Sequence, residues 1–175
     1  MIVLDSTTED VIAHEFFHAL QDASGSYGTA EGRWFWESTA NWAAAVMNPS
    51  GRHSVAFIWS YLKLSHKSIN TFLHILSVGV GEDRSPALYP YGSVLYPIYL
   101  HEITGDESFV PQIWKEGSIA ISPLETIESL LAERGLDFYD VWMEHNASLI
   151  FMDEYTHGDM YQEIIQYDWW NEWSY

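Results

Sequence analysis

Apolar side chains recur at helical spacing in several segments of the chain, and glycine, proline and asparagine residues separate these segments. The first segment predicts a helix from about residue 6 to residue 23 that ends near Gly25. Ser6 and Glu9, three residues apart, match the capping box of a helix start. The apolar residues at helical spacing in this segment are expected to face the core: Val11, Ile12, Phe16 and Leu20.

A second segment, rich in Trp and Ala, follows a loop of glycine and serine residues. Its spacing predicts a helix over about 33–47, which Asn48 and Pro49 end because proline cannot continue a helix. Between residues 50 and 88 the pattern is poor. We expect irregular chain there, with a short helix over about 54–62 and one short strand.

Further helices are predicted in the second half of the chain. One spans about 91–102, kinks at Pro97, where a backbone donor is missing, and ends at Gly105. A short helix follows within 106–117, and the last covers about 138–150.

Between these two lies a helix with signals at both ends. Ser122 is a preferred cap residue, Pro123 stands at the first helical position, and Glu125 completes a capping box. Gly135 then lies just past the end, where glycine commonly terminates a helix.

The composition fits a folded domain. A chain of 175 residues that is 47% apolar can bury a core, and the 16% of aromatic residues, nine Trp among them, predict that this core is rich in aromatic rings. No repeat or low-complexity linker divides the chain. We therefore expect a mainly α domain over residues 1–150, followed by an acidic, aromatic tail, 151–175, that packs on the domain or extends from it.

The balance of charge argues against several partners. With 25 acidic and 7 basic side chains, the formal net charge of −18 would repel both the phosphates of nucleic acids and an anionic membrane surface. No stretch is apolar enough to predict a membrane span, and the first residues do not resemble a signal peptide. Because salt screens such charge, we expect a secreted or extracellular protein.

The stretch HEFFHALQ, residues 14–21, contains an HExxH motif. The chain has no cysteine, so any zinc must be held by histidine and carboxylate ligands. His14 and His18, four residues apart, project from one side of a helix and supply two such ligands. Glu15, beside the first ligand, is the candidate general base that activates a zinc-bound water.

The second predicted helix offers a third ligand. Eighteen residues separate Glu37 from His18, which leaves room for a loop and for the first turn of an antiparallel neighbouring helix. Asn41, one turn further along the same face, is expected to hydrogen-bond the free nitrogen of a ligand histidine. Glu31 is an alternative ligand in the glycine-rich loop. The remaining histidines, among them His145, show no ligand spacing and are assigned to the core or the surface.

With HEFFH, WFWESTANW and the later stretch YPYGSVLYPIYLHEITGDESFVPQIWKEG, the sequence resembles the gluzincins, the thermolysin-like zinc metallopeptidases. The resemblance covers roughly residues 6–150. It implies a Zn²⁺ cofactor, a polypeptide substrate and a tyrosine or histidine that donates a hydrogen bond to the oxyanion. Tyr89 and Tyr91 both match motifs of the family, and His157 is a third candidate for this donor.

The sequence also departs from the family. Many relatives have Asp where Asn41 stands, and they place a β-sheet ahead of the zinc helix, whereas only thirteen residues precede His14 here. We therefore expect the helical catalytic subdomain of a zincin-like metallopeptidase with little or no upper β-sheet. Either the chain is a fragment of a longer precursor with further domains, or it uses a much reduced substrate platform. The alternative is a structural or adhesive extracellular protein of peptidase-derived fold that binds metal without catalysis.

Overall fold

The protein is mainly helical in its computed structural model, which describes residues 9–28, 32–48, 57–71 and 84–150. All regular secondary structure in these ranges is helical, and they contain no strand. The helices are α1 (Glu9–Ser24), α2 (Arg33–Met47), α3 (Ile58–Lys63), α4 (Ser85–Gly92), α5 (Leu95–Thr104), α6 (Phe109–Glu116), α7 (Pro123–Glu133) and α8 (Phe138–Ile150).

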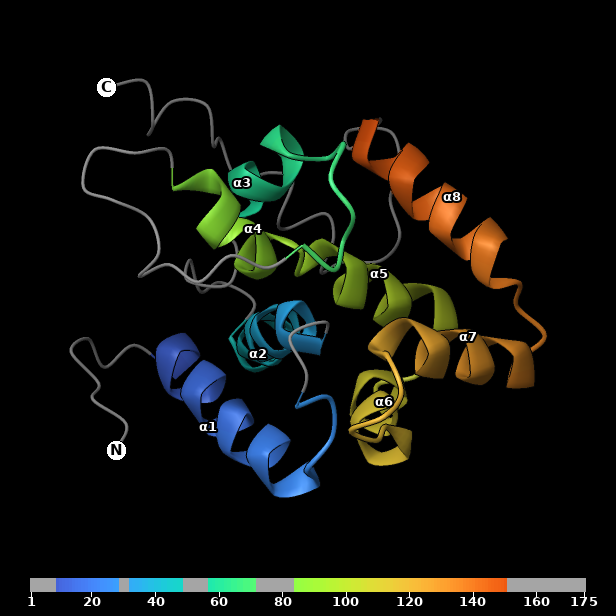
Figure 1. Cartoon of the computed structure of the whole chain (residues 1–175), viewed down its shortest axis with the longest axis horizontal. Coiled ribbons are helices and arrows are strands. Elements are labelled where there is room, and N and C mark those ends of the chain that lie inside the picture. Colours follow the sequence, from blue (N-terminus) through green and yellow to red (C-terminus); the bar gives the residue numbers. More distant parts are fainter. Residues whose placement is uncertain (1–8, 29–31, 49–56, 72–83, 151–175) are drawn as a thin grey trace.

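Helix α2 occupies the centre of the arrangement (Figure 1). Helix α1 packs along one side of it, and α4 and α5 pack on another. Helix α6 contacts both α1 and α5, and α7 leads on from α6 to α8. The loop between α1 and α2 is short, so these two helices lie against each other over much of their lengths.

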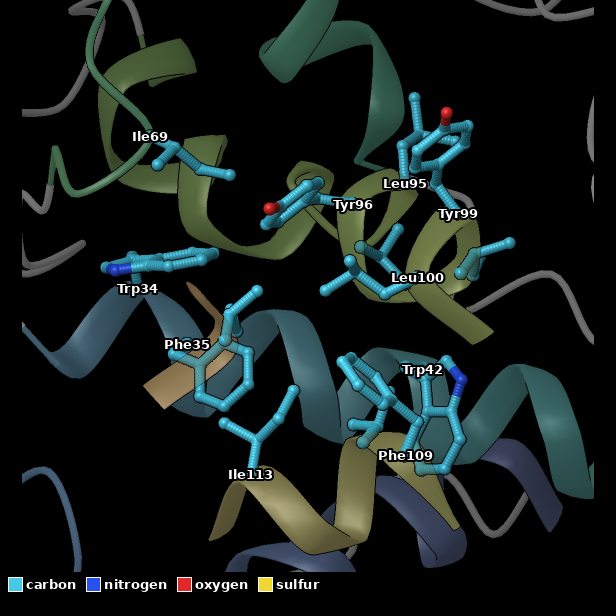
Figure 2. Close-up of a cluster of buried hydrophobic side chains, with 14 of the residues drawn as sticks. Trp34, Phe35, Trp42, Ile69, Leu95, Tyr96, Tyr99, Leu100, Phe109 and Ile113 are labelled. Carbon is cyan, nitrogen blue, oxygen red and sulfur yellow. The ribbon is translucent and has the colours of Figure 1, made fainter. Parts of the chain in front are cut away.

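The sequence of α2 explains its central place. Trp34, Phe35 and Trp42 are buried, and the other buried residues of the helix are the smaller Ser, Thr, Asn and Ala. Small residues allow neighbouring helices to approach closely. These rings belong to one cluster with residues of α5 and α6, among them Tyr96 and Phe109 (Figure 2). The core is therefore as rich in aromatic side chains as the composition predicts.

Several predicted helices are confirmed. The segment predicted over 33–47 is α2 with the same bounds, and 138–150 is α8. A helix was also expected within 106–117 and at Pro123, and both are present as α6 and α7. The predicted start at Ser6 lies outside the described residues, as does the segment 72–83, while the described part of the first helix runs from Glu9 to Ser24.

The expected kink at Pro97 is wrong. The predicted helix over 91–102 is two helices, α4 and α5, which separate after Gly92. Pro97 lies in the first turn of α5, where a backbone N–H has no partner within the helix. The proline therefore removes no helical hydrogen bond and does not bend the helix. At the break, the last residue of α4, Gly92, packs tightly against the start of α3: a side chain there would overlap the backbone of Phe57.

The capping box of α7 is also wrong in part. Ser122 has the extended backbone of a cap residue and Pro123 is the first helical residue, as predicted. However, the Ser122 side chain makes no capping hydrogen bond. The helix start therefore rests on the fixed φ of Pro123 and on the backbone of Ser122, which accepts from the Thr126 N–H. Gly135 follows the helix with a positive φ, as predicted.

The orientation predicted for α1 is wrong. Ile12, Phe16 and Leu20 were expected in the core, but they are 45%, 63% and 50% exposed. The buried residues of α1 are polar: Asp10, His14 and Gln21. An amphipathic helix normally buries its apolar side, so a buried polar side is informative. The polar side of α1 is turned toward α2, where it finds hydrogen-bond partners.

No helix among the described residues is long and apolar enough to cross a membrane. His145, on α8 and outside the HExxH motif, is fully buried among the rings of Tyr61, Tyr96, Tyr99 and Trp142.

Candidate metal centre

The two histidines of the HExxH motif and Glu37 meet at the contact between α1 and α2. His14 and His18 are one turn apart on α1, and their Nε2 atoms lie 3.0 Å from each other. The Oε2 atom of Glu37, on α2, lies 3.5 Å from the Nε2 of His14 and 3.4 Å from that of His18. The structure therefore brings together the three residues that the sequence predicted as metal ligands.

These spacings can be compared with those of a zinc site. Ligand atoms about 2.05 Å from a tetrahedral zinc ion are about 3.3 Å from one another. The three distances of 3.0, 3.4 and 3.5 Å lie close to this value. Two imidazole nitrogens and one carboxylate oxygen also leave a fourth position open, as in catalytic zinc sites. In spacing and in chemistry, the three residues fit a zinc ion.

Asn41 orients the His14 ring, as predicted. The Asn41 amide nitrogen donates to the carbonyl oxygen of Tyr91 at 3.0 Å, so its Oδ1 is turned to the other side. That oxygen lies 2.8 Å from the Nδ1 of His14 and can only accept. His14 therefore carries its proton on Nδ1 and presents a lone pair at Nε2, as a ligand histidine does.

Gln21 makes the corresponding contact with His18 and was not predicted. Its Oε1 lies 2.5 Å from the Nδ1 of His18, and the residue is almost fully buried. A signal was present in the sequence: Gln21 lies three residues after His18, so both share one side of α1. The prediction missed it because the apolar residues of α1 were assumed to face inward.

The protonation pattern makes the cluster rich in electrons. With protons on both Nδ1 atoms, the two Nε2 lone pairs and the Glu37 carboxylate face one another, and Glu37 Oε2 is buried with no hydrogen-bond partner among the described residues. Such an arrangement needs a cation. One shared proton can bridge the 3.0 Å pair, but it leaves the carboxylate at 3.4–3.5 Å, long for a charge-assisted hydrogen bond. A metal ion satisfies all three atoms.

The pKa values follow the same electrostatics. Burial alone would raise the pKa of Glu37, but its contacts with the two imidazoles outweigh burial and lower it to about 2. Burial would lower the pKa of His18, but Glu37, aided by Gln21 and Glu15, raises it above its ordinary value. Glu37 is therefore ionised at neutral pH and ready to bind a cation.

Of the two tyrosines, Tyr91 lies at the site. Its ring is nearly parallel to that of His14, with the centroids 6.2 Å apart. Burial raises the pKa of the Tyr91 hydroxyl, and the charge of Glu37, a hydrogen bond with Glu37 and the charge of Glu15 raise it further. The Tyr89 hydroxyl instead donates to the carbonyl oxygen of Lys67, at 3.3 Å, and is occupied there.

Glu15 follows His14 on α1 and is half-buried, and its charge raises the pKa of both His18 and Tyr91. The remaining candidates, Glu31 and His157, lie outside the described residues, as does the tail, 151–175.

Residues 1–168 match the model of a protein family described as a family of unknown function, DUF6055. The chain belongs to this family. No curated protein and no solved structure matches the chain. The description of this family names no activity.

Proposed function

We propose that this chain is a zinc-dependent peptidase of gluzincin type, in which His14, His18 and Glu37 hold the metal. The observation that carries the proposal is the cluster of three electron-rich atoms, 3.0–3.5 Å apart, with both histidine Nδ1 protons held by amide oxygens. The resemblance of HEFFH and of the Glu37 segment to gluzincin motifs supports the same assignment.

Zinc supplies a Lewis acid that polarises a substrate carbonyl and lowers the pKa of a water molecule. Hydrolysis then needs a group that takes a proton from the attacking water and gives one to the nitrogen of the broken peptide bond. Two observations support Glu15 in this role: it follows His14 on α1, and its charge raises the pKa of His18. Tyr91 can donate its hydroxyl proton in a hydrogen bond to the substrate oxygen that gains negative charge.

The metal is tested first. The purified chain is expected to bind one equivalent of zinc, measured by elemental analysis after dialysis against a weak chelator. Glu37→Gln and His18→Ala are expected to lose it, because each removes one of three ligands. His66→Ala is the matched control, because His66 is an exposed histidine in the turn after α3 and is not one of the three proposed ligands. Zinc retained by His18→Ala would defeat the ligand assignment.

Catalysis is tested separately, with an unfolded protein such as denatured casein as the substrate. Glu15→Gln is expected to keep zinc and lose at least about 100-fold in kcat, the usual scale of general-base catalysis. Glu9→Gln makes the same chemical change at an exposed position of the same helix and should be neutral. Equal activity of Glu15→Gln and the wild type would refute the mechanism, and zinc binding without proteolysis would favour a metal-binding structural protein.

The tyrosines form a second matched pair. Tyr91→Phe is expected to lower kcat by about 10- to 100-fold with little change in zinc content, because it removes a hydrogen-bond donor to the developing charge. Tyr89→Phe removes only a hydroxyl that is bonded to the Lys67 backbone, so its kcat should be that of the wild type. The reverse result would assign the donor to Tyr89.

A further inference from the structure

Gln21 has a set of contacts that fixes the direction of its side-chain amide. Its nitrogen lies 2.9 Å from the carbonyl oxygen of Trp36 and 2.9 Å from the Oγ1 of Thr39. A backbone carbonyl can only accept, so the atom that faces Trp36 is the donor nitrogen. The amide oxygen is therefore the atom that faces His18, at 2.5 Å from its Nδ1.

Hydrogen bonds also fix the direction of the Thr39 hydroxyl. Its hydroxyl donates to the carbonyl oxygen of Phe35 at 2.5 Å, which leaves the oxygen to accept from other groups. It accepts from Gln21 and from the indole Nε1 of Trp114, the latter at 3.1 Å. Thr39 is fully buried. A chain of hydrogen bonds thus runs from Trp114 on α6, through Thr39 on α2 and Gln21 on α1, to the His18 ring.

We propose that Gln21 is a positioning residue of the metal centre: it holds the proton of His18 on Nδ1 and aims the Nε2 lone pair at the point shared with His14 and Glu37. The Gln21 amide has a single orientation, because its oxygen accepts from His18 and its nitrogen donates to Trp36 and Thr39. The expected effect of Gln21 on zinc affinity rests on the proposed function. Its effect on the position of the His18 proton does not depend on zinc binding.

The alternative is that Gln21 only ties α1 to α2. Two variants separate these roles. Gln21→Met keeps the length of the side chain but removes the acceptor, whereas Gln21→Glu keeps an acceptor for the Nδ1 proton and loses the donors to Trp36 and Thr39. Both are expected to lower the thermal stability of the metal-free protein, since both leave the Trp36 carbonyl without its partner.

The two variants should differ in zinc affinity, measured by competition with a chromophoric chelator. Gln21→Met is expected to bind zinc about 10- to 100-fold more weakly, the usual cost of removing a hydrogen-bond partner of a ligand histidine. Gln21→Glu is expected to bind zinc at least as tightly as the wild type. A loss of affinity that follows the loss of stability in both variants would overturn the positioning role.

A second measurement requires no metal. Long-range ¹H–¹⁵N NMR spectra of the metal-free protein report which imidazole nitrogen carries the proton. In the wild type the Nδ1 of His18 should be protonated, and in Gln21→Met neutral His18 should carry its proton mainly on Nε2. His14, which Asn41 holds, is the internal control and should keep its Nδ1 proton in both proteins. An unprotonated Nδ1 in wild-type His18 would overturn the inference.

The two proposals can therefore fail independently. A wild-type protein that binds no zinc refutes the proposed function, whereas the position of the His18 proton decides the assignment of Gln21 whether or not zinc binds.

Discussion

We predict that the folded protein loses stability in mild acid because His145 is fully buried. Its ring is enclosed by the side chains of Tyr61, Tyr96, Tyr99 and Trp142, and its Nδ1 has no hydrogen-bond partner among the described residues. Burial disfavours the charged imidazolium and lowers the pKa of His145 to about 3. In the unfolded chain the pKa returns to about 6.5.

The sign of the effect follows from linkage. Because the unfolded state binds this proton at a higher pH than the folded state, the contribution of neutral His145 is fully present above about pH 6.5. It is lost progressively as the pH falls from there toward about 3. Each pH unit within this window costs about 1.4 kcal/mol. Between pH 7 and pH 4 this one residue is therefore expected to lower the free energy of unfolding by about 3 kcal/mol.

The assay is urea unfolding at a series of pH values, followed by tryptophan fluorescence, on the wild type and on His145→Phe. The variant removes the titrating group and keeps a ring of similar size. Its free energy of unfolding is expected to fall by about 3 kcal/mol less than that of the wild type between pH 7 and pH 4. His66→Phe, at an exposed position, should follow the wild-type curve.

Parallel curves for the wild type and His145→Phe would refute this reasoning. NMR supplies a check that does not depend on the stability of the variant: the wild-type His145 ring should remain neutral at pH 5 in the folded protein. A ring that titrates near pH 6.5 without unfolding would show that the imidazolium is tolerated, and hence that the aromatic enclosure does not exclude its charge.

Three further predictions test the packing and the metal centre. Trp34→Ala, in the core, should cost about 3–5 kcal/mol of unfolding free energy, whereas Phe16→Ala, on the exposed side of α1, should cost less than about 1 kcal/mol; similar losses in chemical denaturation would place Phe16 in the core. Gly92→Ala should cost about 1–3 kcal/mol, because its Cβ would overlap the Phe57 carbonyl oxygen, and an unchanged denaturation midpoint would contradict this contact. Zinc at 100 times its Kd should stabilise the folded protein by about 2.7 kcal/mol, and a thermal shift that survives in Glu37→Gln would show that zinc binds elsewhere.

The sequence determined much of the local structure and the choice of candidate ligands. Helical spacing and proline positions placed α2 and α8 at their observed bounds. The i, i+4 spacing of His14 and His18 put both rings on one side of α1 before any tertiary contact was known. Within a helix, residue spacing alone fixes which side chains are neighbours, so these features could be predicted.

Tertiary structure decided which side of each helix faces the interior. The apolar spacing of α1 predicted that Ile12, Phe16 and Leu20 are buried, but the polar side is buried because α2 offers hydrogen-bond partners there. The i, i+3 spacing made Gln21 a neighbour of His18, but the burial and the fixed orientation of its amide could not be recognised from the sequence. Its role depends on Thr39 and on the Trp36 backbone, which belong to another helix.

The choice between the two tyrosines was also left to the packing of helices. Tyr89 and Tyr91 are two residues apart on α4 and therefore point in different directions. The sequence determined that both are available. Which one reaches His14 depends on how α4 lies against α2, and that orientation is set by contacts between side chains far apart in the chain, such as the hydrogen bond from Asn41 to the Tyr91 backbone.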